Sequence, residues 1–283
     1  MAMTLVVMAA GRGSRFGGMK QVAGIGPSGE SLFDYAVYDA VRCGVDDVVF
    51  VVSPESREAV EAHVEKGCGR HVEVRFVTQE AEGRDKPWGT GHAVLSACAE
   101  TANPFGVVNS DDFYGPRSFE RLGRELPADR DDHLLVAFRL RDCLSSHGGV
   151  SRGVCEVEDG FLASIEELHD VAEVDGTIRS REGVALTGDE LISTNLWGFQ
   201  PSFCRTLSGE FDRFLAEQGD DPDAEFMIGS AVERLGAYGG RRVRVVPTDE
   251  RFLGITFAED VGAVRDEIAG MVDAGRYPSP LWP

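Results

Sequence analysis

The segment that decides the fold lies at residues 5–21, which read LVVMAAGRGSRFGGMKQ. The four apolar residues that open it predict a strand buried on both faces. The loop that follows is rich in glycine, which lets a backbone approach a ligand closely and turn its N–H groups toward an anion. Arg12, Arg15 and Lys20 add positive charge to this loop. The segment therefore predicts a strand that leads into a polyphosphate-binding loop.

Two common phosphate-binding motifs do not fit this loop. A P-loop fails because Lys20 comes one residue late and Gln21 stands where Ser or Thr is required. A dinucleotide-binding fingerprint fails because Phe16 stands where the third glycine belongs. The segment is similar instead to the signature loop of nucleotidyltransferases that make nucleotide sugars, in which an apolar strand runs into A-A-G-x-G-x-R-x-x-x-x-x-K. The matching residues are Ala9, Ala10, Gly11, Gly13, Arg15 and Lys20.

This resemblance implies a role for each matching residue. The two alanines and two glycines are expected to bind the nucleotide, and Arg15 and Lys20 to act in catalysis. Lys20 would stabilise charge on the α-phosphate, while Arg15 and the N–H groups of the loop would hold the departing pyrophosphate. The resemblance also implies a Rossmann-like α/β fold of the GT-A type.

Composition limits the partners and the compartment. The 283 residues carry a formal charge of −20, which argues against nucleic acid and anionic membrane because both need a basic surface. Anionic substrates then require a local positive site. The six cysteines include no C-x-x-C pair, which predicts free thiols in a reducing cytosol. The start of the chain lacks a signal-peptide pattern, and its apolar run is too short to span a membrane, so a cytoplasmic location is expected.

Strand and helix patterns alternate through the first half of the chain. The predicted strands are 5–8, 48–52, 71–79, 105–108 and 134–138. The predicted helices are 32–41, a segment from Ser53 and Pro54 to Lys66, and 90–99. This alternation predicts a doubly wound, mostly parallel α/β sheet.

The second half is richer in strands, so the sheet is expected to be mixed. A hairpin is predicted at 149–157 and 161–168, a strand at 191–199 and another at 243–246, with helices near 207–215, 226–235 and 261–272. The acidic stretch 169–190 is interpreted as an excursion from the core. One domain is expected over residues 1–283, with a nucleotide-binding half at 1–140 and an acceptor-binding half at 141–283.

Two features predict a reader of the base. Gln79 leaves a predicted strand and offers both a donor and an acceptor. Ten residues later the chain reads GTGHA at 89–93. This pair of features resembles that of uridylyltransferases acting on N-acetylglucosamine 1-phosphate, which carry a Gln followed by G-T-G-H-A. The resemblance implies that Gln79, Gly89 and Thr90 contact the base. A solvated strand end and a helix cap are the structural alternatives for these residues.

A carboxylate at a strand end predicts a magnesium site. Asp111 follows the strand at 105–108, where ligands gather in doubly wound sheets, and Mg²⁺ binds through one or two carboxylates plus phosphate oxygens. Asp112 is the alternative ligand. Relatives often supply a second ligand late in the chain, where this sequence has Thr256. Asp249 and Glu250 are the alternatives for that second position.

For the acceptor, the resemblance points to Gly149, Glu166 and Asn195. In the family the corresponding Gly precedes the hairpin, and the corresponding Glu and Asn hold sugar hydroxyls. Glu167 is a close competitor of Glu166. The similarity in this half of the chain is looser than in the first half.

The sequence therefore predicts a Mg²⁺-dependent nucleotidylyltransferase that joins an NTP to a sugar 1-phosphate. One alternative is a cytidylyltransferase that acts on a phosphorylated alcohol or polyol. The other is a non-catalytic regulatory protein that binds nucleotide sugars. A homo-oligomer is compatible with the sequence, and the apolar tail at 277–283 is a candidate interface.

Overall fold

The computed structural model describes residues 2–11, 19–81, 83–126, 131–145, 147–235 and 241–282. The strands are β1 (Thr4–Ala9), β2 (Asp47–Val52), β3 (Glu73–Thr78), β4 (Phe105–Asn109), β5 (Asp112–Phe113), β6 (His133–Arg139), β7 (Val150–Glu158), β8 (Phe161–Val174), β9 (Thr177–Arg179), β10 (Ala185–Leu186), β11 (Leu191–Ser193), β12 (Trp197–Phe199), β13 (Val243–Pro247) and β14 (Leu253–Gly254). The α-helices are α1 (Leu32–Arg42), α2 (Arg57–Lys66), α3 (Thr90–Ala97), α4 (Pro116–Glu125), α5 (Phe203–Gln218), α6 (Ile228–Glu233) and α7 (Asp260–Asp273). Short 3₁₀ helices are η1 (Lys20–Val22), η2 (Cys68–Arg70), η3 (Cys98–Glu100) and η4 (Leu140–Cys143).

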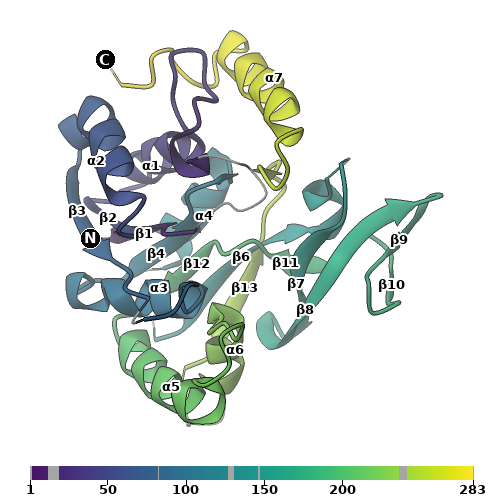
Figure 1. The fold of residues 1–283 in the computed structure, drawn as a ribbon. Helices are drawn as coiled ribbons and strands as arrows, with labels where there is room; N and C mark the ends of the chain where they lie inside the picture. Colours follow the sequence, from purple (N-terminus) through teal and green to yellow (C-terminus); the bar gives the residue numbers. More distant parts are fainter. Residues whose placement is uncertain are drawn as a thin grey trace.

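Twelve strands of the described residues form one sheet in the order β10-β9-β8-β7-β11-β6-β12-β4-β1-β2-β3, with β13 beside β6 and β8 (Figure 1). β1 pairs in parallel with β2 and β4, and β2 pairs in parallel with β3. β12 runs antiparallel to both β4 and β6, and β13 runs parallel to β6. The strands β1–β4, β6 and β13 therefore share one direction, which confirms the predicted mixed, mostly parallel central sheet.

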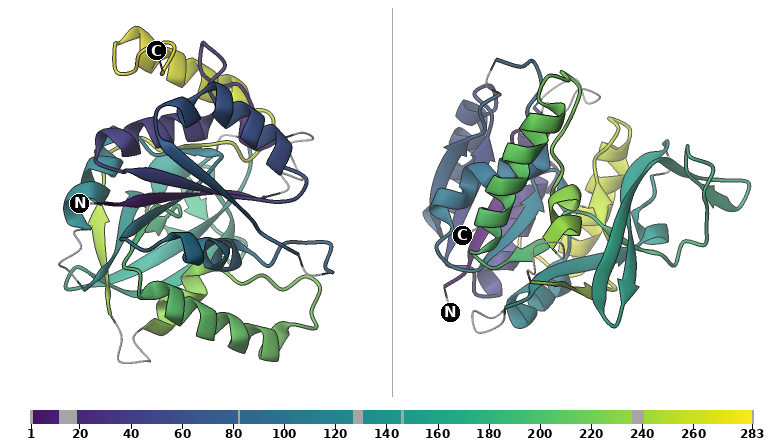
Figure 2. Two further views of the ribbon diagram at one scale, coloured as in Figure 1. Left: turned by 90° about the vertical axis from the view of Figure 1, so that its left-hand side faces the viewer. Right: turned by 90° about the horizontal axis from the view of Figure 1, so that it is seen from below.

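Helices cover both faces of the central sheet (Figure 2). Alternate residues of β1 enter two separate cores: Leu5 and Val7 pack on the side of α1, α2 and α4, whereas Val6 and Met8 pack on the side of α3, α5 and α6. Because neither face of β1 reaches water, both sets of positions are apolar, as the opening run predicts. None of the described helices has the length and apolar character needed to cross a membrane.

A long hairpin projects from the sheet (Figure 1). β7 and β8 meet at Asp159 and Gly160, which take positive φ angles of 51° and 82°. β8 continues to Val174, and β9 and β10 extend the sheet beyond it. The segment 169–190, interpreted from sequence as an excursion, therefore forms the far end of the sheet.

Two predicted element boundaries are wrong. The strand expected at 191–199 is divided into β11 and β12, because Asn195 between them has a φ angle of 64° that interrupts extended backbone. The helix expected from Ser53 begins only at Arg57. Ser53 and Ser56 instead form a turn in which the Ser56 N–H donates to Ser53 Oγ at 3.1 Å.

The expectation that all cysteines are free thiols is wrong for two of them. Cys98, in η3, forms a disulfide with Cys204 at the start of α5, with their Cα atoms 5.6 Å apart. The bond ties the end of α3 to α5, two helices on the same face of the sheet. Sequence spacing alone could not show this pairing, since 106 positions separate the two cysteines.

A third apolar cluster lies under α7. Ile25, which follows η1, packs there with Phe113 of β5 and Ile268 of α7. Tyr277 and Leu281 close the cluster and are 3% and 1% exposed. These two residues of the tail are therefore buried within the chain and unavailable for the interface considered from sequence.

Candidate active site

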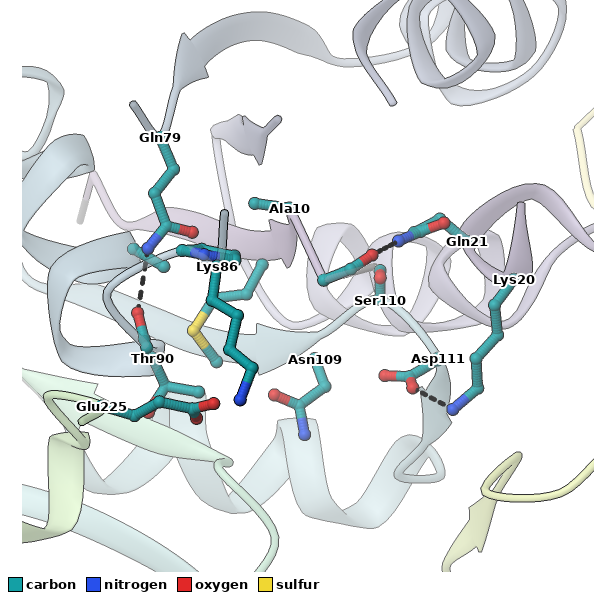
Figure 3. A pocket seen from close by; sticks show the side chains of 15 residues that line it. Ala10, Lys20, Gln21, Gln79, Lys86, Thr90, Asn109, Ser110, Asp111 and Glu225 are labelled. Carbon is teal, nitrogen blue, oxygen red and sulfur yellow. Dashed lines mark hydrogen bonds and ion pairs between the residues drawn. The ribbon is translucent and has the colours of Figure 1, made fainter. Parts of the chain in front are cut away.

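A cavity of about 510 Å³ lies beyond the carboxyl ends of β1, β3 and β4 (Figure 3). Parallel strands bring these ends to one edge of a sheet, so the loops that leave them meet there. The cavity is lined by Met8, Ala10, Gly11, Lys20, Gln21, Gln79, Lys86, Pro87, Gly89, Thr90, Ala93, Asn109, Ser110, Asp111 and Glu225.

Most residues predicted to bind nucleotide or metal meet in this cavity. Ala9 does not line it, because its side chain is fully buried within β1. Gly13 and Arg15 lie outside the described residues. The remaining predicted residues, which all line the cavity, are Ala10, Gly11, Lys20, Gln79, Gly89, Thr90 and Asp111.

One end of the cavity carries an ion pair between the signature loop and the strand end after β4. Lys20 Nζ lies 2.5 Å from Asp111 Oδ2, and their side chains are 12% and 31% exposed. The neighbouring Gln21 donates from Nε2 to the carbonyl oxygen of Gly11, which fastens η1 to the end of β1. The ion pair with Asp111 and the hydrogen bond of the neighbouring Gln21 to Gly11 therefore hold Lys20 opposite Asp111.

The other end carries the predicted reader of the base. Gln79 Nε2 donates to the carbonyl oxygen of Gly89 at 2.9 Å and lies 3.3 Å from His92 Nδ1. The His92 ring stacks on Phe211, with centroids 4.7 Å apart. These contacts fix the Gln79 amide through its nitrogen. Gln79 Oε1 is the atom of the amide that these contacts leave as an acceptor.

The GTGHA segment is fastened to the start of α6. The Phe226 N–H donates to the Trp88 carbonyl at 2.6 Å, and the Gly91 N–H donates to the Phe226 carbonyl at 2.8 Å. The Ile228 N–H donates to Thr90 Oγ1 at 3.2 Å. Residues from the second half of the chain therefore set the position of the GTGHA segment.

Polar side chains connect the strand end after β4 to the break between β11 and β12. Asn109 Nδ2 donates to Asp112 Oδ2 at 2.7 Å, and Asn195 Nδ2 lies 3.4 Å from Asn109 Oδ1. Asn195 Oδ1 in turn accepts from Trp197 Nε1 at 3.2 Å. Burial, and then the charge of Asp111, raise the pKa of Asp112 to about 7. Asp112 therefore acts as an internal partner of Asn109, while Asp111 faces the cavity.

Asp111 is a single carboxylate in the cavity, which suits Mg²⁺ better than a metal ion that needs several protein ligands. No group of three or more His, Cys, Asp or Glu residues within the described ranges could hold a metal ion. Mg²⁺ needs only one or two carboxylates when substrate phosphates supply further oxygens. Thr256, Asp249 and Glu250 line a separate cavity of about 530 Å³, so none of these candidates for the second ligand lines the cavity at Asp111.

Two residues predicted to hold the acceptor, Gly149 and Glu166, do not line this cavity. Gly149 precedes β7, and a Cβ atom there would lie 2.7 Å from Cα of Asp170, so glycine permits the close approach of the two strands. Glu166 is exposed on β8 and shares its face with Leu168, which packs on the side of α1. Asn195, in contrast, contacts the cavity-lining Asn109.

Glu167 occupies the opposite face of β8 from Glu166. Ile165, two residues earlier and on the same face as Glu167, packs into the core formed with α6. Because side chains alternate along a strand, Glu167 lies on the side of the sheet that α3, α5 and α6 cover. Burial raises the pKa of Glu167.

Sequence reasoning missed several residues that line the cavity. Asn109 and Ser110 precede Asp111, and a strand-end position could have pointed to them. Lys86 lies in the long bridge between Gln79 and the GTGHA segment. Glu225 comes from the loop between α5 and α6, and nothing in the sequence pattern places it here.

Comparison with known proteins agrees with this geometry. Residues 5–145 match the family model of the MobA-like NTP transferase domain. A search among curated proteins finds no match.

Several solved structures share the fold over nearly the whole chain. A putative glucose-1-phosphate thymidylyltransferase from Bacillus anthracis matches with a TM-score of 0.67 and 13% identity, over 94% of this chain and 95% of that chain. The inositol-1-phosphate CTP transferase from T. maritima matches with a TM-score of 0.65 and 15% identity, over 94% and 95%. A UDP-glucose pyrophosphorylase complexed with UDP-glucose matches with a TM-score of 0.65 and 18% identity, over 94% and 98%.

The fold and the matched domain together define the class: the chain is a nucleotidyltransferase. Residues 5–145 are the part of the chain that is similar to the MobA-like NTP transferase domain. The class is that of an enzyme, which favours catalysis over the non-catalytic alternative considered from sequence.

Proposed function

We propose that this nucleotidyltransferase joins an NTP to a sugar 1-phosphate in a Mg²⁺-dependent reaction that yields an NDP-sugar and pyrophosphate. The observation that supports it is a single cavity with Gln79 at one end and the Lys20–Asp111 pair at the other. Two of the similar structures are named for transfer to glucose 1-phosphate or inositol 1-phosphate, both phosphorylated rings that carry hydroxyl groups.

Nucleotidyl transfer requires positioning and charge neutralisation, and no side-chain nucleophile. An oxygen of the acceptor phosphate attacks the α-phosphorus, and the bond from that phosphorus to the bridging oxygen of the leaving pyrophosphate breaks. Lys20 Nζ exchanges Asp111 for an oxygen of the α-phosphate and neutralises its charge. Arg15 and the N–H groups of Gly11 and Gly13 hold the pyrophosphate.

Asp111 would then be free to hold Mg²⁺ together with phosphate oxygens of the substrate, and the ion would supply positive charge beside the triphosphate. Asp112 keeps Asn109 in place behind it through the bond from Asn109 Nδ2. Gln79 Oε1 accepts from the base, with Gly89 and Thr90 beside it. For the acceptor we propose Asn195 and Gly149, with Glu166 or its neighbour Glu167 binding the hydroxyl groups.

A cytidylyltransferase that acts on a phosphorylated polyol is the second candidate. The likeness to the inositol-1-phosphate CTP transferase favours it. Gln79 Oε1 accepts equally well from the amino group of cytosine and from the imide N–H of uracil or thymine.

A pyrophosphate-release assay tests the proposal. The five nucleotides ATP, GTP, CTP, UTP and dTTP are each combined with Mg²⁺ and with glucose 1-phosphate, N-acetylglucosamine 1-phosphate, inositol 1-phosphate or choline phosphate. Release with a sugar 1-phosphate supports the first function, and release only with CTP and a polyol or choline phosphate supports the second. No release over the whole panel contradicts both.

Lys20→Ala tests the assignment of the catalytic cation. Removing one electrostatic contact of this kind typically lowers kcat by ~10²–10³. Lys66→Ala is the matched control, because Lys66 ends α2 and does not line the cavity. We expect Lys20→Ala to stay folded by circular dichroism and to lose pyrophosphate release, whereas Lys66→Ala keeps it. Normal turnover by Lys20→Ala would refute its role.

A further inference from the structure

Lys86 is a cation of the cavity to which neither the signature loop nor the predicted metal site assigns a role. The chain has only three lysines among its 28 lysine and arginine residues, at positions 20, 66 and 86. Two of these three line the same cavity, where Lys20 and Lys86 are the basic residues among the described lining residues. A chain that uses arginine almost everywhere else has therefore placed two lysines at one site.

The backbone on either side of Lys86 is fixed. The Arg84 guanidinium donates to the carbonyl oxygens of Asp221, Pro222 and Ala224 at 3.2, 2.6 and 2.9 Å. It also lies over the ring of Trp88, 3.8 Å from the centroid.

Trp88 is 5% exposed and makes edge contacts with Phe211 and Phe214. Lys86 is thus carried on a short bridge anchored two residues before it and two residues after it. The bridge presents Lys86 and Pro87 to the cavity.

Figure 3 shows Lys86 and Lys20 entering the cavity from opposite sides, with Asn109 and Asp111 between them. The resting partner of Lys86 is Asp223, whose Oδ1 lies 2.7 Å from Nζ. The side chains of this pair are 51% and 77% exposed, and ion pairs as exposed as this contribute little to stability. Lys86 can therefore leave Asp223 at small cost.

We propose that Lys86 Nζ binds a phosphoryl group of a substrate held between Lys20 and Lys86. This inference rests on the proposed nucleotidyl transfer. A lysine suits the task because it is a compact point charge on a flexible stem, whereas the planar guanidinium of arginine prefers fixed two-pronged contacts. The phosphoryl group belongs either to the NTP or to the acceptor, since both bring phosphate into this cavity.

The competing explanation is that Lys86 only ties the bridge to the loop of Asp223. The two explanations differ in the effect of Asp223→Ala. Loss of a tie would affect Lys86→Ala and Asp223→Ala alike. Loss of a phosphate contact would affect Lys86→Ala alone, because Asp223 does not line the cavity.

The experiment compares wild type with Lys86→Ala, Lys86→Arg, Asp223→Ala and Lys66→Ala. Calorimetry measures the affinity for the NTP that is active in the panel, for its uncharged nucleoside and for inorganic triphosphate. Steady-state pyrophosphate release gives KM for the NTP and for the acceptor. Thermal unfolding checks that every variant is folded, and it should be unchanged for Lys86→Ala.

We expect Lys86→Ala to weaken binding of one phosphorylated substrate by about 10- to 100-fold, the effect of losing a hydrogen bond to a charged group. Lys86→Arg should recover part of this loss, and Asp223→Ala and Lys66→Ala should bind like wild type. Weaker NTP binding with unchanged nucleoside binding identifies a phosphate of the NTP. Unchanged NTP binding with a raised KM for the acceptor identifies the acceptor phosphate.

Three results would overturn the assignment of Lys86. These are unchanged constants for Lys86→Ala, an equal loss in Asp223→Ala, and a loss of nucleoside affinity as large as that of NTP affinity. A wild-type protein that releases no pyrophosphate refutes the proposed function separately. In that case the affinity for inorganic triphosphate tests the assignment of Lys86. Equal affinities of wild type and Lys86→Ala would overturn the assignment.

Discussion

Gly89→Ala tests how the GTGHA segment at 89–93 is built. Gly89 has φ 100° and ψ −177°, a conformation that is essentially restricted to glycine. An added Cβ atom would lie 2.7 Å from the carbonyl oxygen and 3.0 Å from the nitrogen of Phe226. Both are backbone atoms fixed by hydrogen bonds to Trp88 and Gly91, so no side chain can move aside to accept the methyl group.

The magnitude follows from these contacts. The backbone conformation alone costs roughly 1–3 kcal/mol for a residue with a Cβ atom. Separating the segment from Phe226 also loses two hydrogen bonds, each with a net contribution of about 1 kcal/mol. We therefore expect a total cost of about 3–5 kcal/mol, which a domain of ordinary stability survives.

Urea denaturation and NTP calorimetry measure this cost together. If the segment stays in place, the unfolding free energy falls by the full amount. If the segment detaches locally, the lost hydrogen bonds still lower the unfolding free energy, and NTP affinity falls as well; a loss of 3 kcal/mol in binding corresponds to more than about 100-fold.

Gly209→Ala in α5 is the matched control, because a Cβ atom there meets nothing within 4 Å. Alanine in a helix interior should stabilise the protein by about 0.5–1 kcal/mol, which is the opposite sign. A Gly89→Ala protein with wild-type stability and wild-type NTP affinity would refute the described contact with Phe226.

Three further predictions concern other parts of the molecule. Gly149→Ala should destabilise the protein by about 1–3 kcal/mol because its methyl group meets the backbone of Asp170, and an unchanged urea midpoint would contradict this packing. Replacing Cys98 and Cys204 by serine should lower the unfolding free energy by about 2–4 kcal/mol. A reducing agent should lower the unfolding free energy of the wild type and leave that of the double variant unchanged. A wild type whose stability does not change on reduction would exclude the disulfide. Burial, and less strongly Arg241, lower the pKa of His133 from 6.5 to about 4, so the unfolded chain takes up a proton in this range that the native state does not. The stability advantage of wild type over His133→Gln should therefore shrink as pH falls from 6.5 to about 4, by up to about 1.4 kcal/mol per unit, and parallel pH profiles would rule this out.

Much of the fold follows from the sequence because its central strands are buried on both faces. The apolar runs in β1, β2 and β4 predict strands without further information, and the signature loop identifies the edge at which ligands bind. α4 was missed because only Phe119 and Leu122 form its apolar stripe. Gly115, with a φ angle of 75°, and Pro116 at the first helical position were the signals available.

The candidate site was predictable where it depends on loops directly after strands. Lys20, Gln79 and Asp111 belong to this group, and all three line the cavity. Glu225 does not follow a strand directly. It reaches the cavity because α5 and α6 pack against α3. Only the folded chain brings such residues together, since no local pattern records contacts between distant segments.

The cluster under α7 has a consequence for biosynthesis. Lys20 and Asp111 are made early, and the apolar residues next to them, Ile25 and Phe113, are covered by Ile268 of α7 and by the tail. A nascent chain that already contains both charged residues therefore leaves this apolar surface open until residues 260–281 have been made. Domains that depend on such distant contacts are exposed to aggregation while they wait for them. The end of the cavity that carries Lys20 and Asp111 is thus synthesised long before the helix and tail that cover its apolar support.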